Sequence, residues 1–256
     1  MKQKIYRLIR KNRLVRKIRD LSNFLSGTEI GLAGVPEKAR SLVLAPHQDD
    51  ESIGCGGTLN LLTRAGGSFD VVYLSDGQAG GKLGIPVTDG YRKDLQLIRK
   101  KEAEMACAVL GASRLYFLGG TDSQLHLETD LSEKIAELLR QQNYDLIFCP
   151  WPHESHSDHA AAFSILQSAL RMSPKRNLKI WPYEVWTPLI PNRIIDISKA
   201  FETKRKAISL YKSQMENTDY AEAFTGLARY RSIQVPGAKY AEAFLEGDAD
   251  FILSLR

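Results

Sequence analysis

The sequence contains little cysteine. Three cysteines occur in 256 residues, at Cys55, Cys107 and Cys149. They are spaced too widely for a zinc finger and are too few for a disulfide scaffold. We therefore expect the protein to reside in a reducing compartment, the cytoplasm.

Long apolar runs are lacking as well. No stretch reaches the roughly 20 apolar residues that a membrane-spanning helix needs. Charged residues interrupt the N-terminal segment every two or three positions, so the apolar core of a signal peptide is not expected there. A chain of 256 residues suits one large domain, or one domain with a small appendage, and is long enough for a sizeable core.

Positive charge is concentrated at one end of the chain. Of the Lys and Arg residues that give a net charge of +5, nine lie in residues 1–19, which leaves a net charge of −4 for the rest. The body thus gives no reason to expect a nucleic-acid partner. Residues 2–25 predict a basic helix with a leucine stripe, within an extension of residues 1–39. Either residues 1–25 lie on anionic lipid at the inner face of the membrane, gaining roughly 1 kcal/mol per basic residue, or the stripe packs on the body.

From residue 40 onward, strand-like and helix-like segments alternate with short connections. Strands are expected at 41–45, 69–74, 115–118, 145–149, 179–186, 193–197 and 251–255. Helices are expected after the first of these strands and at 93–110, 131–141, 158–171 and 201–215, the last with Lys204, Arg205 and Lys206 exposed. This order predicts an α/β fold with a Rossmann-like, mostly parallel sheet flanked by helices.

Histidine is scarce, and four of the five histidines lie in two short segments, 46–51 (PHQDDE) and 153–159 (HESHSDH). The first segment follows the first expected strand and the second follows the fourth. In a Rossmann-type order these two strands are neighbours at the point where strand order reverses. We therefore expect a site at the carboxyl ends of strands one and four.

The two segments supply the ligands of a catalytic metal. His47, Asp50 and His159 form a two-histidine, one-carboxylate set that leaves a position open for water, as in catalytic zinc sites. The same set also serves non-haem iron, so Fe²⁺ is an alternative to Zn²⁺. Asp49, which is not a ligand, is expected to be the general base toward the metal-bound water.

Two further residues of the second segment are expected to act on the substrate. His156, as imidazolium, would stabilise the oxyanion of a tetrahedral intermediate, and Asp158 would orient and charge it. His153 is expected to be a bystander. Each segment has a simpler explanation: a histidine after a strand is usually a surface or core residue, and the acidic run 49–51 suits a helix N-terminus. A metal site accounts for both segments together.

The glycines at 54, 56 and 57 suggest a dinucleotide site only weakly. They follow an acidic turn, which is hostile to pyrophosphate, and the second strand lacks the acidic residue of the full fingerprint. We expect these glycines to let a helix pack close to the sheet.

At these motifs the sequence resembles the PIG-L (LmbE-like) de-N-acetylase family over roughly residues 40–245. Segment 46–51 is similar to the first family motif, with Gln48 where proline is usual, and residues 156–159 (HSDH) match the second. Weaker similarity is found at 75–80 (SDGQAG), 99–111, 118–125 (LGGTDSQL), 183–188 (YEVWTP) and 213–214.

The resemblance implies a hydrolase, usually with zinc, that removes the acetyl group from an N-acetylated amino sugar, commonly N-acetylglucosamine in a glycoconjugate. It implies a deacetylase domain over residues 40–256. It also implies a role for each site residue. His47, Asp50 and His159 would bind the metal, and Asp49 would be the base. His156 would stabilise the oxyanion with Asp158 as its partner, and Arg99 and Asp122 would contact the sugar.

Other interpretations remain open at this stage. The same site could serve an amidase acting on a non-sugar acyl amine. A non-catalytic module that binds a dinucleotide or a partner is disfavoured by Asp49, which a structural metal would not need. Tyr91, Trp151 and Trp186 suit either sugar stacking or ordinary packing. Segments 82–90 and 216–238 are expected to select the sugar and whatever lipid or nucleotide it is linked to.

Overall fold

A computed structural model describes residues 34–80, 88–174, 177–215 and 218–255 of the chain. The basic helix expected in residues 2–25 and most of segment 82–90 lie outside these ranges, so both interpretations of the extension remain predictions. Within the described ranges, none of the helices combines the length and apolar character that a membrane crossing requires.

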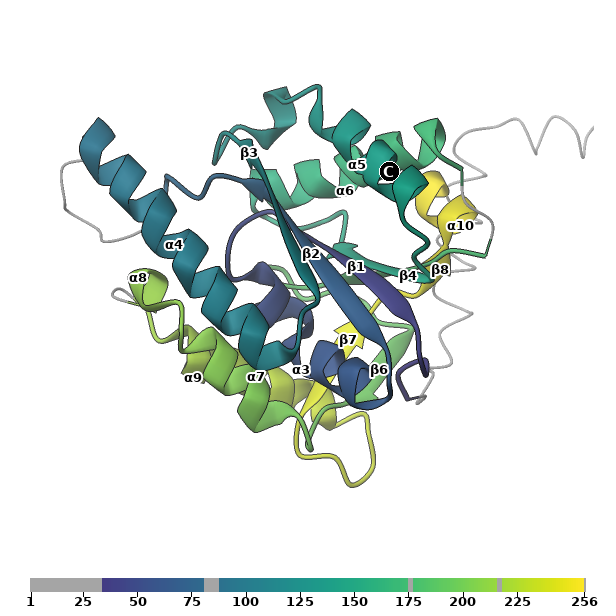
Figure 1. Ribbon diagram of the computed structural model, residues 1–256. Coiled ribbons are helices and arrows are strands. Elements are labelled where there is room, and N and C mark those ends of the chain that lie inside the picture. Colours follow the sequence, from purple (N-terminus) through teal and green to yellow (C-terminus); the bar gives the residue numbers. More distant parts are fainter. Residues whose placement is uncertain (1–33, 81–87, 175–176, 216–217, 256) are drawn as a thin grey trace, which may run out of the picture.

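The strands form one mixed sheet (Figure 1) in the order β3-β2-β1-β4-β5-β7-β6, with β8 paired to β5. Strands β1 to β5 run parallel, whereas β6, β7 and β8 pair antiparallel. The expectation of a mostly parallel α/β sheet is confirmed. The strands are β1 (Arg40–Ala45), β2 (Ser68–Ser75), β3 (Arg114–Gly120), β4 (Leu146–Pro150), β5 (Lys179–Tyr183), β6 (Arg193–Asp196), β7 (Ala241–Phe244) and β8 (Gly247–Asp248).

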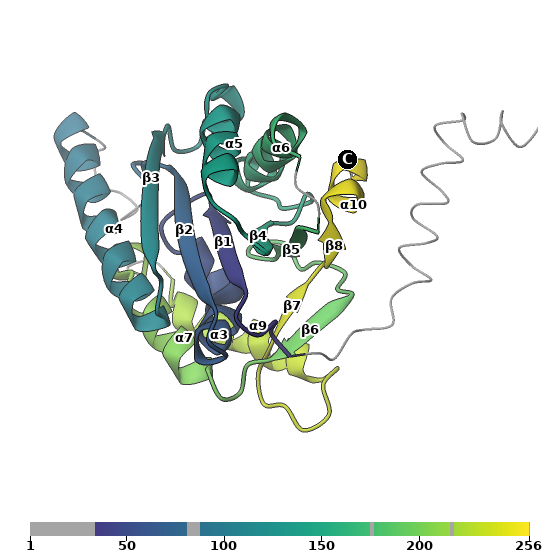
Figure 2. The same ribbon diagram turned by 45° about the vertical axis from the view of Figure 1, so that its right-hand side comes forward.

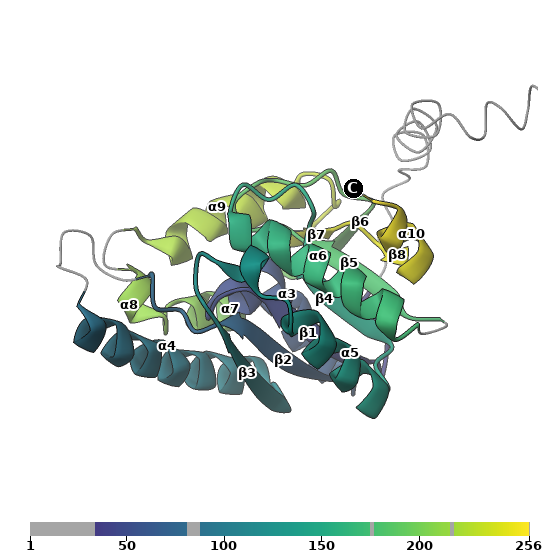
Figure 3. The ribbon, with the colours of Figure 1, turned by 90° about the horizontal axis from the view of Figure 1, so that it is seen from above.

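Helices cover both faces of the sheet, as Figures 2 and 3 show. One face packs against α3, α4, α7 and α9, and the other against α5, α6 and α10. Strand β1 alternates between these two cores, which explains its unbroken apolar sequence. The helices are α3 (Asp50–Arg64), α4 (Asp89–Leu110), α5 (Leu131–Gln141), α6 (Ser157–Met172), α7 (Phe201–Ile208), α8 (Lys212–Met215), α9 (Tyr220–Ser232) and α10 (Ala249–Ser254), with the 3-10 turn η1 (Leu125–Leu127).

The expected C-terminal strand at 251–255 is wrong, because these residues belong mainly to α10. The carboxylate of Asp248 accepts a hydrogen bond from the Phe251 amide and so caps the helix. A short apolar run has no clear period, and here the cap determines the outcome.

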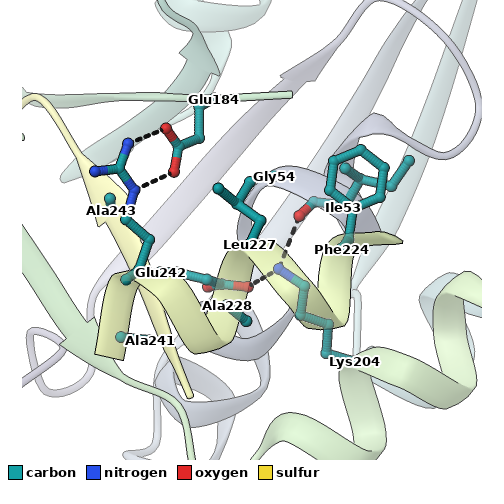
Figure 4. Close-up of a pocket in the computed structure, with 11 residues that line it drawn as sticks. Ile53, Gly54, Glu184, Lys204, Phe224, Leu227, Ala228, Ala241, Glu242 and Ala243 are labelled. Carbon is teal, nitrogen blue, oxygen red and sulfur yellow. Dashed lines mark hydrogen bonds and ion pairs between the residues drawn. The ribbon is translucent and has the colours of Figure 1, made fainter. Parts of the chain in front are cut away.

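The helix expected at 201–215 is divided into α7 and α8. The intervening residue Tyr211 is buried, and its hydroxyl donates to Glu51 Oε1 at 2.5 Å. The expectation that Lys204 is exposed is also wrong, since it is only 3% exposed. Its ammonium donates to Glu242 Oε1 at 2.5 Å and to the Ile53 carbonyl at 2.7 Å (Figure 4), so a buried ion pair replaces solvent.

Two glycines allow α3 to lie close against its neighbours, as expected. A Cβ atom at Gly54 would lie 2.2 Å from the Tyr183 ring, and one at Gly57 would lie 2.7 Å from Cδ1 of Ile197. Helix α3 begins with Asp50, so this close packing also fixes where that carboxylate stands.

We expect Gly54→Ala to lower stability by about 1–3 kcal/mol, because the added methyl group overpacks against Tyr183. Thermal unfolding measures the effect. Gly226→Ala is the matched control: Gly226 lies in α9, nothing lies within 4 Å of its added Cβ, and alanine is the better helix former. An unchanged melting temperature in Gly54→Ala would show that α3 can move away without cost.

Candidate metal centre

The two histidine segments meet at one edge of the sheet. Strands β1 and β4 are adjacent and parallel, with Ser41 opposite Leu146 and Val43 opposite Phe148. The segments that follow them therefore emerge side by side. The ring centroids of His47, His156 and His159 lie 4.9, 5.4 and 5.0 Å apart in pairs. The fold thus brings together residues about a hundred positions apart, as expected.

Asp50 lies between two of these histidines. Its Oδ2 atom is 3.3 Å from His47 Nδ1 and 3.3 Å from His159 Nε2. It also accepts a hydrogen bond from the His47 backbone amide at 2.9 Å. Burial alone would raise the pKa of this carboxyl, but the adjacent His159 and His47 rings hold the pKa well below its ordinary value. Asp50 is therefore an anion, as a metal ligand must be.

His159 supplies the test of whether the site fits a metal. It is fully buried, and neither ring nitrogen makes a hydrogen bond among the described residues: Asp50 Oδ2 faces Nε2 at 3.3 Å and Glu154 Oε2 faces Nδ1 at 3.9 Å, both outside good hydrogen-bond geometry. Buried polar atoms normally have hydrogen-bond partners, and leaving one unpaired costs free energy. A metal ion bound at Nε2, beside Asp50, would satisfy the ring. The residues present therefore fit a divalent ion.

His47 contacts carboxylates on both sides of its ring. Its Nε2 atom lies 3.2 Å from Asp158 Oδ2 and 3.3 Å from Asp122 Oδ1, on the side away from Asp50. Besides the expected set with Asp50, the described residues offer two groups that could hold a metal: His47 with His156 and His159, or His47 with Asp122 and Asp158. Asp122, expected to contact sugar, thus lies against a candidate ligand.

The Asp158 carboxylate lies against His47 and the loop that follows β3. Its carboxylate contacts His47 and accepts hydrogen bonds from the backbone amides of Ser123 (2.7 Å) and Leu125 (3.2 Å). No hydrogen bond joins it to the His156 ring among the described residues; instead, its backbone amide donates to His156 Nδ1 at 3.2 Å. The carboxylate is thus placed to orient His47, while its charge also raises the pKa of His156, so its expected role toward His156 stays a prediction.

His156 is half-buried at the N-terminus of α6. Burial lowers its pKa, and the charges of His47 and His159 lower it further. The charges of Asp50 and Asp158 act in the opposite direction and raise it. Because Nδ1 accepts the Asp158 amide, the proton of the neutral ring is assigned to Nε2. A neutral ring in this state still offers one N–H donor.

Asp49 stands beside the candidate ligands in a strained backbone conformation, with φ 152° and ψ −26°. Such strain in a residue other than glycine often occurs at functional sites. Its side chain makes no helix-capping bond among the described residues, so a simple cap does not explain the acidic run. Burial raises the pKa of Asp49 to about 7, although the Arg99 guanidinium, 3.5 Å away, acts to lower it.

Arg99 lies beneath the site. Its buried guanidinium donates to the carbonyls of Gln48 (3.0 Å) and Gly77 (3.3 Å) and pairs with Asp49 and Asp122. These contacts hold the turn 47–50 in place. They also use much of the hydrogen-bonding capacity of the Arg99 guanidinium, which was expected to contact sugar. Gln48, where the family usually has proline, donates to the Ser75 carbonyl at 2.9 Å and joins the same support.

Glu154 is a residue that sequence reasoning missed. Its buried carboxylate accepts the backbone amides of Val185 (2.6 Å), Trp186 (3.0 Å) and Thr187 (3.1 Å). Oε2 also lies 3.9 Å from His159 Nδ1. Its partners lie more than thirty residues further along the chain, so no local pattern signals the role. His153, the expected bystander, packs on Trp151 and belongs to neither candidate ligand group.

Comparison with known families adds an independent finding to this geometry. Residues 42–170, which hold both histidine segments, match the family described as PIG-L: GlcNAc-PI de-N-acetylase. The chain belongs to the PIG-L family. It is therefore a deacetylase, an enzyme that hydrolyses an amide.

PIG-L relatives match over most of their length. Diacetylchitobiose deacetylase from Thermococcus kodakarensis is 28% identical, over 78% of this chain and 80% of its own. The Bacillus cereus protein named "Probable N-acetyl-alpha-D-glucosaminyl L-malate deacetylase 2" is 31% identical, over 68% and 83%. The solved structure of N,N'-diacetylchitobiose deacetylase from Pyrococcus horikoshii, with its inhibitor MPG, superposes with a TM-score of 0.72 at 26% identity, covering 83% of this chain and 85% of that one.

Proposed function

We propose that this deacetylase removes the acetyl group from an N-acetylated amino sugar of the N-acetylglucosamine type, with one zinc ion held by His47, Asp50 and His159. The observation that carries the proposal is the position of Asp50 Oδ2, 3.3 Å from a ring nitrogen of each histidine. The ring of His159, which makes no hydrogen bond among the described residues, supports it. The sugar is supported by the names of the relatives, which give diacetylchitobiose and N-acetyl-alpha-D-glucosaminyl L-malate as the compounds deacetylated.

The surrounding carboxylates prepare this ligand set. With Asp50 facing Nδ1 of His47, the Asp158 carboxylate on Nε2 fixes the orientation and tautomer of the ring. Zinc, when bound there, would act as a Lewis acid and lower the pKa of a water molecule to about 7. Zn²⁺ is chosen over Fe²⁺ because hydrolysis of an amide needs no redox change.

The remaining chemistry falls to two side chains. Asp49, whose pKa burial raises to about 7, accepts the proton of the attacking water. The same carboxyl then returns that proton to the sugar nitrogen as the C–N bond breaks, so acetate and a free amine are released. The Nε2–H group of neutral His156 donates to the developing oxyanion.

Acetate release from a panel of N-acetylglucosamine conjugates tests the proposal. We expect chelation to abolish release and added Zn²⁺ to restore it, since the nucleophile depends on the metal. Anaerobic Fe²⁺ added to the same chelated protein serves as the comparison for metal identity. If zinc-loaded protein released no acetate from any conjugate, the amino-sugar substrate would be wrong and a non-sugar acyl amine would replace it.

A further inference from the structure

Two aromatic side chains from distant parts of the chain meet beside the metal centre. Trp186 follows β5, Tyr220 begins α9, and their rings make a T-shaped contact at 5.8 Å. Trp186 is 48% exposed, and Tyr220 is partly buried. The Trp186 ring therefore presents a large aromatic surface to solvent, while Tyr220 packs against it.

Tyr220 is electrostatically coupled to the charged groups of the site. Burial raises the pKa of its phenol, the Asp49 and Asp50 carboxylates raise it further, and Arg99 opposes them. A phenol that senses these three charges lies within range of the catalytic turn. The aromatic pair therefore borders the site.

The turn that carries Trp186 is attached to the metal-binding segment. The Glu154 carboxylate accepts the Trp186 amide at 3.0 Å, and its Oε2 atom lies 3.9 Å from His159. Two further hydrogen bonds reach Thr187: the Trp151 indole donates to its carbonyl at 2.7 Å, and the Ser155 amide to its hydroxyl at 2.9 Å. The backbone of Trp186 is thus joined through one carboxylate to the candidate ligand His159.

A buried ion pair fixes α9 against the same turn. Glu184, which Figure 4 shows pointing into a pocket beside α9, pairs with Arg231 through two hydrogen bonds, one of them at 2.7 Å. Glu184 also accepts the Leu189 amide, and Arg231 donates to the Leu189 carbonyl at 2.8 Å. The hydrogen bonds of the Glu184–Arg231 pair thus join both ends of the turn 184–189 to the helix that begins with Tyr220. The aromatic pair is consequently preorganised.

We propose that Trp186 and Tyr220 form a stacking subsite for a second pyranose ring, linked to the N-acetylated sugar; this inference rests on the proposed function. A pyranose presents an apolar C–H face, which packs on an exposed aromatic ring, while its hydroxyl groups remain in water. The acetylated ring must reach the metal ligands, whereas Trp186 lies beyond the Glu154 carboxylate. The ring that meets Trp186 is therefore the neighbour, and the preferred substrate class is a disaccharide or longer.

The test compares kcat/KM for acetate release from N-acetylglucosamine and from N,N'-diacetylchitobiose. We expect the wild type to prefer the disaccharide, and Trp186→Ala to reduce that preference about tenfold, the value of one aromatic contact. Trp186→Phe should restore most of the preference because it keeps an aromatic face. Tyr230→Ala, which removes a 61% exposed tyrosine of the same helix, should leave it unchanged.

Two results would overturn the subsite: a wild type that does not prefer the disaccharide, or a Trp186→Ala variant that loses activity on both substrates equally. If the wild type releases acetate from neither of these sugars nor from any conjugate of the panel, the proposed function fails instead. In that case, isothermal titration calorimetry measures the affinity of both sugars for zinc-loaded wild type and for Trp186→Ala, and this tests the subsite independently of turnover. Equal disaccharide affinity in the two proteins would overturn it.

Discussion

Replacing Asp49 by asparagine is expected to lower kcat by about 10²–10⁴-fold, the usual contribution of a general base, while zinc remains bound. Asp50 and His159 keep their contact in this variant, because Asp49 takes no part in it. Asparagine also has nearly the size and shape of aspartate, so the substitution removes the charge and leaves the side-chain volume at this position almost unchanged. Acetate release and zinc content, measured on the same preparation, give the two halves of the result.

The matched control is Asp250→Asn, an exposed aspartate in the first turn of α10, which should keep full activity. Full turnover in zinc-bound Asp49→Asn would remove this carboxyl from the reaction. Loss of zinc together with turnover would make Asp49 part of the metal site and reassign the base. Retained zinc with lost turnover is the outcome that the geometry supports.

The meeting of the two histidine segments could be predicted because it depends on topology. A histidine and two acids after one buried strand, and His-x-x-His after another, lie on neighbouring strands of a Rossmann-like sheet. Strand order converts a separation of about a hundred residues into contact. The position of Asp50 between His47 and His159 follows from that order and from the N-terminus of α3.

The supporting contacts could not be predicted, since they join polar residues that no periodic pattern relates. Lys204 stands in a run of three basic residues that suggests a solvated surface, yet it is buried against Glu242. Glu242 in turn accepts the backbone amides of Gly57 and Thr58 in α3 at 2.9 and 2.8 Å. The buried acid Glu242 also interrupts the apolar run of β7, which explains why the sequence did not predict that strand.

Asp158 shows a similar limit within the site. Its place two residues after His156 suggested a partnership between them, but residues at i and i+2 do not face each other on a helix. At the start of α6 the carboxylate turns instead to His47 and to the amides of residues 123 and 125. The role of a carboxylate next to a motif thus depends on the neighbouring loop, which the motif does not encode.

Replacing His159 by glutamine is expected to abolish high-affinity zinc binding, and activity with it. Loss of an outer-shell partner of a metal ligand costs about 10–100-fold in affinity, and loss of the ligand itself should cost more. Zinc raises the melting temperature of a protein that binds it only when folded. We therefore expect zinc to stabilise the wild type and the His153→Gln control, and to leave His159→Gln unaffected.

This experiment also decides between the proposed centre, with Asp50 and His159, and the group of His47, Asp122 and Asp158. If His159→Gln still binds zinc and is stabilised by it, the ion belongs with His47, Asp122 and Asp158. In that case Asp122→Asn would lose zinc, whereas the proposed centre predicts that Asp122→Asn keeps it. The buried ring of His159 favours the proposed centre, because its nitrogens make no hydrogen bond within the described residues and its Nε2 atom faces the Asp50 carboxylate at 3.3 Å.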